Sequence, residues 1–189
     1  MNTLKDCPVE LLQDEWEFEQ LLSIYINKQP KNILEIGSFY GGTLWYWLTK
    51  SKVDKALTID WPVPTSDGRY QQMIESKNKW KDWIDGITFN YIKGDSTHSK
   101  TIDEAKLFFG NEPIVDFLFI DGGHDYKTVK SDYENYSSLV KQGGIIVLHD
   151  VIGLGEVKQF WDELKSSGKA YIEICNNSQI GWGIGIIYV

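Results

Sequence analysis

The stretch Ile33–Gly42 reads Ile-Leu-Glu-Ile-Gly-Ser-Phe-Tyr-Gly-Gly and decides the interpretation of the fold. A short apolar run is interrupted by one acid, a tight glycine turn follows, and an amphipathic segment comes next. This order is typical of a first parallel strand that seats a nucleoside-bearing cofactor at its carboxyl end.

The spacing of the glycines indicates which kind of cofactor the turn receives. A dinucleotide fingerprint requires Gly-x-Gly-x-x-Gly, because its middle glycine lets the backbone approach a pyrophosphate. Gly37 and Gly42 fit that frame, but Phe39 holds the middle position. The spacing Gly37-x-x-x-Gly41 therefore favours a cofactor without phosphates, such as S-adenosylmethionine, over NAD.

Strands alternate with helices along the rest of the chain, which predicts a doubly wound, Rossmann-like α/β fold. Two final strands without a helix between them predict an antiparallel pair at one edge of a seven-stranded, mostly parallel sheet. We expect one domain over residues 1–189, with a helix and lead-in over 1–30 and a cofactor-binding core over 31–189. Strands are expected at 33–36, 56–59, 87–92, 115–120, 145–148, 170–174 and 183–189. Helices are expected at 10–27, 43–50, 69–84, 101–109, 126–140 (ended by Gly143-Gly144) and 157–164.

The bulk composition narrows the possible partners. The formal charge is −8 and no cluster of Lys and Arg stands out, so a nucleic-acid backbone is not an expected ligand. No stretch approaches the roughly 20 apolar residues that a membrane span needs. Cys7 and Cys175 form no Cys-x-x-Cys pair, as expected for a protein of the reducing cytoplasm. A small molecule is the expected partner.

Each of the first five predicted strands carries an acid at or just before its carboxyl end, where ligands bind in such sheets. Helix capping is the alternative for any single one of these acids. Asp60 lies 25 residues after Glu35, near the spacing at which an acid meets ribose hydroxyls. Glu35 could face a cationic amino or sulfonium group, or bond to backbone, and Asp95-Ser96 would approach adenine. The predicted cofactor-binding residues are Glu35, Gly37, Ser38, Gly41, Gly42, Asp60, Trp61, Asp95, Ser96 and Asp121.

A second group of polar residues follows the fourth and fifth strands. Asp121-Gly-Gly-His124 ends one strand and His149-Asp150 ends the other, which brings carboxylates and imidazoles together if these strands are neighbours. Carboxylates bind hard divalent cations, and imidazole favours manganese or a transition metal over magnesium. His124 is a suitable general base because its ordinary pKa is near 6.5. The alternatives are a surface histidine at 124 and a structural histidine at 149.

Together these motifs resemble the class I S-adenosylmethionine-dependent methyltransferases. Phe119-Ile-Asp-Gly-Gly-His-Asp-Tyr126, then Asp132, then Gly143-Gly-Ile-Ile-Val-Leu-His-Asp150, are similar to a narrower group, the metal-dependent small-molecule O-methyltransferases. That group includes catechol, caffeoyl-CoA, cephalosporin-hydroxylase-like and macrolide-sugar types. The resemblance covers the chain from about residue 29 onward.

The resemblance implies methyl transfer to a hydroxyl of a sugar, phenol or secondary metabolite. It implies metal ligands at Asp121 and Asp150, with His149 as a candidate third ligand for Mg or Mn, and His124 as the base. Val151 stands where the catechol type has an asparagine, and His149 where the sugar type has an acid. A homodimer that completes the acceptor pocket is also expected. The competing functions are an NAD-dependent oxidoreductase and a non-catalytic cofactor-binding module of the same fold.

Overall fold

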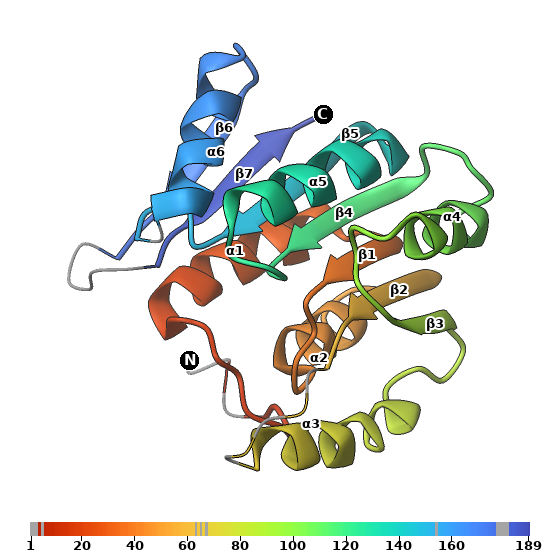
Figure 1. The fold of residues 1–189 in the computed structure, drawn as a ribbon. Coiled ribbons are helices and arrows are strands. Elements are labelled where there is room, and N and C mark those ends of the chain that lie inside the picture. Colours follow the sequence, from red (N-terminus) through yellow and green to blue (C-terminus); the bar gives the residue numbers. More distant parts are fainter. Residues whose placement is uncertain are drawn as a thin grey trace.

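The computed structural model describes residues 4, 6–62, 64, 66, 68–153, 155–176 and 182–189, and within them the predicted α/β architecture is confirmed. The described residues form one seven-stranded sheet in the order β3-β2-β1-β4-β5-β7-β6 (Figure 1). Strands β1 to β5 are parallel to one another, while β7 runs antiparallel to both β5 and β6. The strands are β1 Asn32–Ile36, β2 Lys55–Asp60, β3 Thr88–Lys93, β4 Val115–Ile120, β5 Val140–His149, β6 Tyr171–Ile174 and β7 Ile184–Tyr188.

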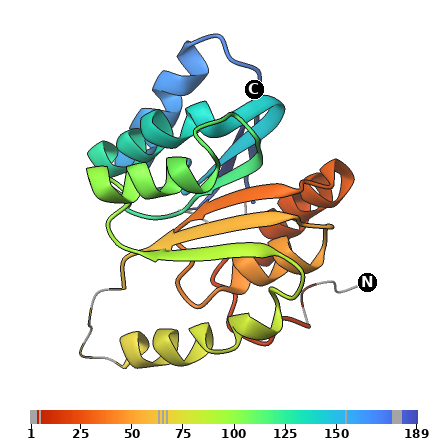
Figure 2. The same cartoon turned by 90° about the vertical axis from the view of Figure 1, so that its right-hand side faces the viewer.

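Helices cover both faces of the sheet, so the central strands are buried on each side (Figure 2). Helices α4, α5 and α6 lie on one face, and α1 and α2 lie on the other. The helices are α1 Glu15–Lys28, α2 Gly42–Thr49, α3 Arg69–Lys77, α4 Ser99–Phe108, α5 Tyr126–Tyr136 and α6 Gly155–Ser166, with short 3-10 turns at Trp80–Asp82 and Ser137–Leu139.

The core therefore has two halves, and aromatic side chains fill much of both. On the face of α1 and α2, the buried ring of Trp47 packs against Tyr25 and Phe117 at centroid distances of 4.7 and 4.8 Å. On the opposite face, Phe160 of α6 packs edge-on against Tyr133 of α5 at 5.5 Å. These packed layers hold the strands rigidly, and their carboxyl ends meet along a single edge.

Three predicted helix boundaries are wrong by more than two residues. Helix α1 starts at Glu15 and not at residue 10, because Asp14 caps it by accepting a hydrogen bond from the Glu17 backbone at 2.9 Å. Helix α3 ends at Lys77 and not at residue 84, and a separate 3-10 turn follows at Trp80–Asp82.

The third error is the helix expected at 126–140, which ends at Tyr136. Val140 pairs with Val115 and begins β5, so Gly143-Gly144 lies inside that strand and does not terminate a helix. The φ of +79° at Gly143 shows that this part of the strand is irregular. The spacing of Tyr126, Val129, Tyr133, Tyr136 and Val140 is that of one helix face, but Val140 belongs to strand β5.

No helix among the described residues is long and apolar enough to cross a lipid bilayer.

Candidate active site

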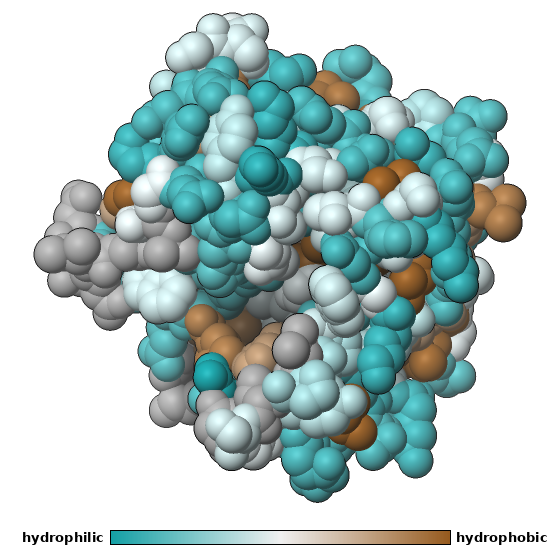
Figure 3. Space-filling view, viewed as in Figure 1, coloured by the Kyte–Doolittle hydropathy of each residue, from teal (hydrophilic) through white to brown (hydrophobic). Residues whose placement is uncertain are grey.

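A cavity of about 670 Å³ opens at the carboxyl ends of the parallel strands. Acids at or just after the ends of four of these strands line it together: Asp60, Asp95, Asp121 and Asp150. Figure 3 shows this hollow, with apolar side chains at its edge. The expectation that the strand-end acids converge on one place is met for these four residues because parallel strands present their carboxyl ends on the same side.

The glycine turn after β1 forms the floor of the cavity. Gly37 has a φ of +87°, and a Cβ built on it would lie 1.9 Å from the Asp121 carbonyl oxygen. Ser38, Phe39 and Gly42 also line the cavity. Gly41 does not, because it packs against the Trp80 indole, where a Cβ would lie only 2.3 Å from Nε1. The turn therefore needs glycine for close contacts between backbone segments and with one buried ring.

Glu35 lies beneath this turn and outside the cavity lining. Its fully buried carboxylate accepts hydrogen bonds from the Thr43 hydroxyl at 2.7 Å, the Trp47 indole at 3.0 Å and the Thr58 hydroxyl at 3.1 Å. Burial nevertheless raises the pKa of Glu35 to about 7. The side chain points to the face covered by α2, so it lies outside the cavity in which we expected it to meet a cation.

Asp60, the predicted ribose-binding acid, lies at the cavity wall and is paired with a lysine that sequence reasoning missed. Lys77 Nζ is 2.8 Å from Asp60 Oδ2, with both side chains largely buried, and its charge lies over the Trp80 ring at 4.3 Å. Burial lowers the pKa of Lys77, opposed by Asp60. The pair holds the carboxylate in place. Trp61, next to it, is exposed at the cavity mouth.

Asp95 and Ser96 follow β3 and line the cavity as predicted. Asp95 Oδ1 accepts hydrogen bonds from the Thr97 backbone at 2.8 Å and the Thr97 hydroxyl at 2.7 Å, so this acid also stabilises its own turn. The Ser96 carbonyl accepts from the Tyr136 hydroxyl at 2.7 Å. Both residues are therefore fixed in position at the β3 end of the cavity.

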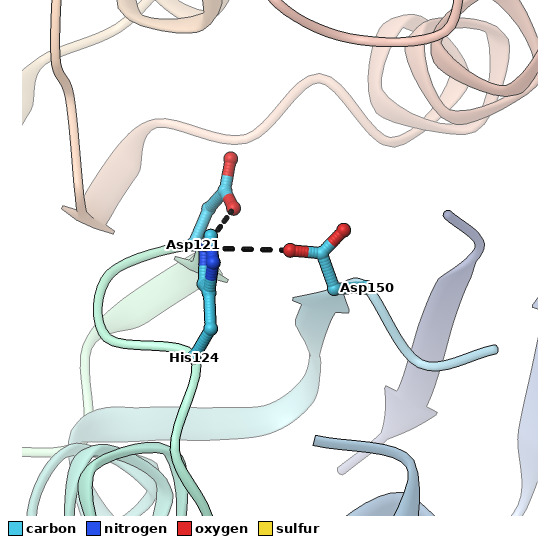
Figure 4. Close-up of side chains that lie close together, drawn as sticks. All are labelled: Asp121, His124 and Asp150. Carbon is cyan, nitrogen blue, oxygen red and sulfur yellow. Dashed lines mark ion pairs between the residues drawn. The ribbon is translucent and has the colours of Figure 1, made fainter. Parts of the chain in front are cut away.

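The predicted group after β4 and β5 is assembled in space. His124 Nε2 lies 3.3 Å from Asp150 Oδ2 and 3.8 Å from Asp121 Oδ1, so its ring points between the two acids (Figure 4). His149 approaches the same carboxylates from inside, with Nδ1 3.1 Å from Asp121 and 3.3 Å from Asp150. Asp150 has a backbone φ of +62°, which residues other than glycine rarely adopt, and it is only 1 % exposed. Such strain is common where a side chain must face a ligand.

The charges in this group are strongly coupled. Burial opposes ionisation of Asp121, but His149 and His124 hold its pKa well below the usual range. Burial alone would lower the pKa of His149, yet Asp121 and Asp150 raise it to about 10. Asp121, and then the charge of Asp150, also raise the pKa of His124. His124 is half-exposed and His149 is buried, and both side chains line the cavity.

The donor set fits a divalent cation. Asp121, His124 and Asp150 each offer one ligand atom, and these three atoms lie within 4.8 Å of one another. Both carboxylate oxygens of Asp150 are buried, and apart from the ion pairs with His124 and His149 they have no hydrogen-bond partner among the described residues, which leaves them able to bind a cation. The cluster contains His124 where we expected His149.

Two cavity-lining residues carried no sequence signal that would have singled them out. Gln13, in the segment before α1, donates from Nε2 to Asp121 Oδ2 at 2.8 Å. Trp182, just before β7, stacks on His149 with ring centroids 5.7 Å apart. The sequence is rich in aromatics, and only the structure separates Trp182 from those in the core.

Comparison with known proteins gives a consistent result. The family described as "Methyltransferase domain" matches residues 34–151. An uncharacterized protein of Acanthamoeba polyphaga mimivirus is 32% identical over 126 residues, which cover 65% of this chain and 52% of that protein. An uncharacterized protein of Sinorhizobium fredii is 26% identical over 164 residues, 85% of this chain and 17% of that protein. The chain thus spans about half of the first relative and a smaller part of the second.

Among solved structures, the chain is similar in fold to an O-methyltransferase from Bacillus cereus in complex with SAH (S-adenosylhomocysteine). The TM-score is 0.66 at 14% sequence identity, and the match covers 100% of this chain and 87% of the other. At this level of identity the likeness shows a shared fold.

Proposed function

This chain belongs to the methyltransferase-domain family, and on that premise we propose that it transfers the methyl group of S-adenosylmethionine to a hydroxyl of a small molecule. One observation carries the proposal: four strand-end acids line one cavity, and His124 points between two of them. The B. cereus O-methyltransferase of the same fold holds S-adenosylhomocysteine, the demethylated form of this donor, which supports the choice of cofactor.

The order of the strands suggests how the cofactor lies. Asp95 and Ser96 follow β3, Asp60 ends β2 and the glycine turn follows β1, so adenine, ribose and the sulfur-bearing chain would cross the sheet edge in that order. A carboxylate such as Asp60 can accept from both ribose hydroxyls. Phe39 lines the cavity at the position where a dinucleotide site needs glycine, which supports a cofactor without a pyrophosphate.

Methyl transfer is an in-line displacement at carbon. The acceptor oxygen attacks the methyl group, the carbon–sulfur bond breaks, and S-adenosylhomocysteine leaves with the bonding electron pair. The acceptor hydroxyl loses its proton to His124 Nε2, whose ring is half-exposed toward the cavity. Much of the rate would come from holding the two reactants in line.

A divalent cation, when bound by Asp121, His124 and Asp150, would supply Lewis acidity that favours the alkoxide of the acceptor. A ligating His124 could not take the proton at the same atom, so the two uses of His124 exclude each other. A screen of hydroxyl acceptors with labelled cofactor, run with and without a chelator, tests for the metal. Loss of transfer with the chelator shows that a metal is needed, with either His124 or His149 as its third ligand, and unchanged transfer leaves His124 Nε2 free to take the proton.

The proposal of the cofactor is tested by thermal unfolding with and without S-adenosylhomocysteine. A ligand that binds only the folded state at one hundred times its Kd stabilises by about 2.7 kcal/mol, which raises Tm by several degrees. No shift at saturating ligand contradicts the proposal. A shift with NAD and none with S-adenosylhomocysteine supports the oxidoreductase instead.

A further inference from the structure

Gln13 carries an unused hydrogen-bond acceptor at the wall of the cavity. Its Nε2 donates to Asp121 Oδ2 at 2.8 Å, whereas its Oε1 is buried and has no hydrogen-bond partner in the described part of the chain. The direction of the amide follows from chemistry: the opposite orientation would set Oε1 against a carboxylate oxygen, and two acceptors repel each other. Oε1 is therefore the atom left free for a donor, and an unsatisfied buried acceptor is costly unless a ligand or water satisfies it.

The segment that carries Gln13 is held firmly against the site. A Cβ on Gly42 would lie 2.6 Å from the Glu10 carbonyl oxygen and 2.9 Å from the Leu11 Cα, so this segment packs directly on the helix that follows the glycine turn. At its other end, Glu17 of α1 accepts from the Gly183 backbone at 3.0 Å. The position of Gln13 is thus fixed from both sides.

The order of the strands tells which part of a bound donor would reach this atom. Asp95 and Asp60 occupy the ends of β3 and β2, and Asp121 follows β4, on the far side of β1. Neighbouring strands lie about 4.8 Å apart, so the molecule that spans Asp95 to Gly37 continues to Asp121 with its amino-acid half. That half carries an α-ammonium group with three donors, which a carboxylate and an amide oxygen can accept.

We propose that Gln13 Oε1 accepts a hydrogen bond from the α-ammonium group of the methyl donor, and that Gln13 also positions Asp121 through Nε2. This inference rests on the proposed function. It makes Gln13 a residue that recognises the amino-acid half of the cofactor and has no part in binding the nucleoside half.

The experiment compares two ligands by isothermal titration calorimetry: S-adenosylhomocysteine, which has the ammonium, and 5′-methylthioadenosine, which lacks the amino-acid portion. Gln13→Leu keeps the bulk of the side chain and removes both polar atoms, and Gln13→Ala serves as a second variant. Gln159→Ala, an exposed glutamine on the outer helix α6, is the matched control. Asp60→Asn is the positive control, because ribose is common to both ligands.

Loss of a hydrogen bond to a charged group raises the Kd by about tenfold or more. We expect Gln13→Leu to weaken the binding of S-adenosylhomocysteine by at least that factor and to leave the Kd of 5′-methylthioadenosine within about twofold of its value in the unaltered protein. Asp60→Asn should weaken the binding of both ligands. An unchanged Kd for S-adenosylhomocysteine, or an equal loss for both ligands, overturns the inference and leaves the proposed function standing. If the unaltered protein binds neither nucleoside, the proposed function fails, and this inference fails with it.

Discussion

Gly37→Ala is expected to destabilise the fold far more than the same change at another glycine with positive φ. Gly37 and Gly110 have φ values of +87° and +72°, so alanine meets a similar backbone penalty at both, about 1–2 kcal/mol. Only at Gly37 does the new Cβ collide with backbone, 1.9 Å from the Asp121 carbonyl oxygen, while nothing lies within 4 Å of it at Gly110. Restoring even a 3.0 Å contact requires a shift of 1.1 Å (3.0 − 1.9) between the β1 turn and the end of β4.

Forcing extra atoms into packed structure typically costs about 1–3 kcal/mol. The free energy of unfolding should therefore fall by about 2–5 kcal/mol in Gly37→Ala and by about 1–2 kcal/mol in Gly110→Ala. Urea denaturation followed by circular dichroism measures both values. The displacement of Asp121 should also weaken the binding of S-adenosylhomocysteine in Gly37→Ala, whereas Gly110→Ala should bind it normally. If the two variants unfold within about 0.5 kcal/mol of each other, the close backbone contact is not what glycine serves at this turn.

Two further predictions concern pH. Burial raises the pKa of Asp132 from 3.8 to about 7, so the folded state holds this proton more tightly than the unfolded state, and the stability that it contributes is lost as pH rises from about 4 to 7. This loss is on the order of 4 kcal/mol, and Asp132→Asn should escape it. In urea denaturation, the free energy of unfolding of the variant should therefore rise relative to that of the unaltered protein between pH 4 and pH 8. A difference between the two proteins that does not change with pH contradicts the assignment. In the unaltered protein the rate of methyl transfer should rise with pH, with a midpoint above 6.5, because Asp121 and Asp150 raise the pKa of His124. His124→Gln should abolish this rise and lower the rate with an acceptor from the screen by about 10²–10⁴-fold. Unchanged turnover removes His124 as the base.

The position of a residue at a strand end was a better guide to the site than its chemistry. Asp60 ends β2, and Asp95, Asp121 and Asp150 follow their strands; all four line the cavity, whereas Glu35 precedes the last residue of β1 and points into the core. Because side chains alternate between the faces of a strand, one position decides whether an acid faces a ligand or a helix. The pattern of acids alone could not separate these cases.

Long-range partners of the site residues were not predictable. Lys77 pairs with Asp60 across 17 positions, and Gln13 reaches Asp121 across 108. Neither residue belongs to a motif, since a lysine at the end of a helix and a glutamine before one are ordinary in any soluble chain. The homodimer that would complete the acceptor pocket stays a prediction, and light scattering tests it.

The sequence by itself determined the order of the elements and the edge at which polar groups collect, because hydrophobic periodicity, turn glycines and strand-end acids are local properties. Tertiary structure alone decided that Gln13 and Trp182 join the site, that His124 lies between Asp121 and Asp150, and that Glu35 is withdrawn from it. These outcomes depend on which segments pack against which. They are set by the summed contacts of two cores on either side of the sheet, and no window of neighbouring residues contains that information.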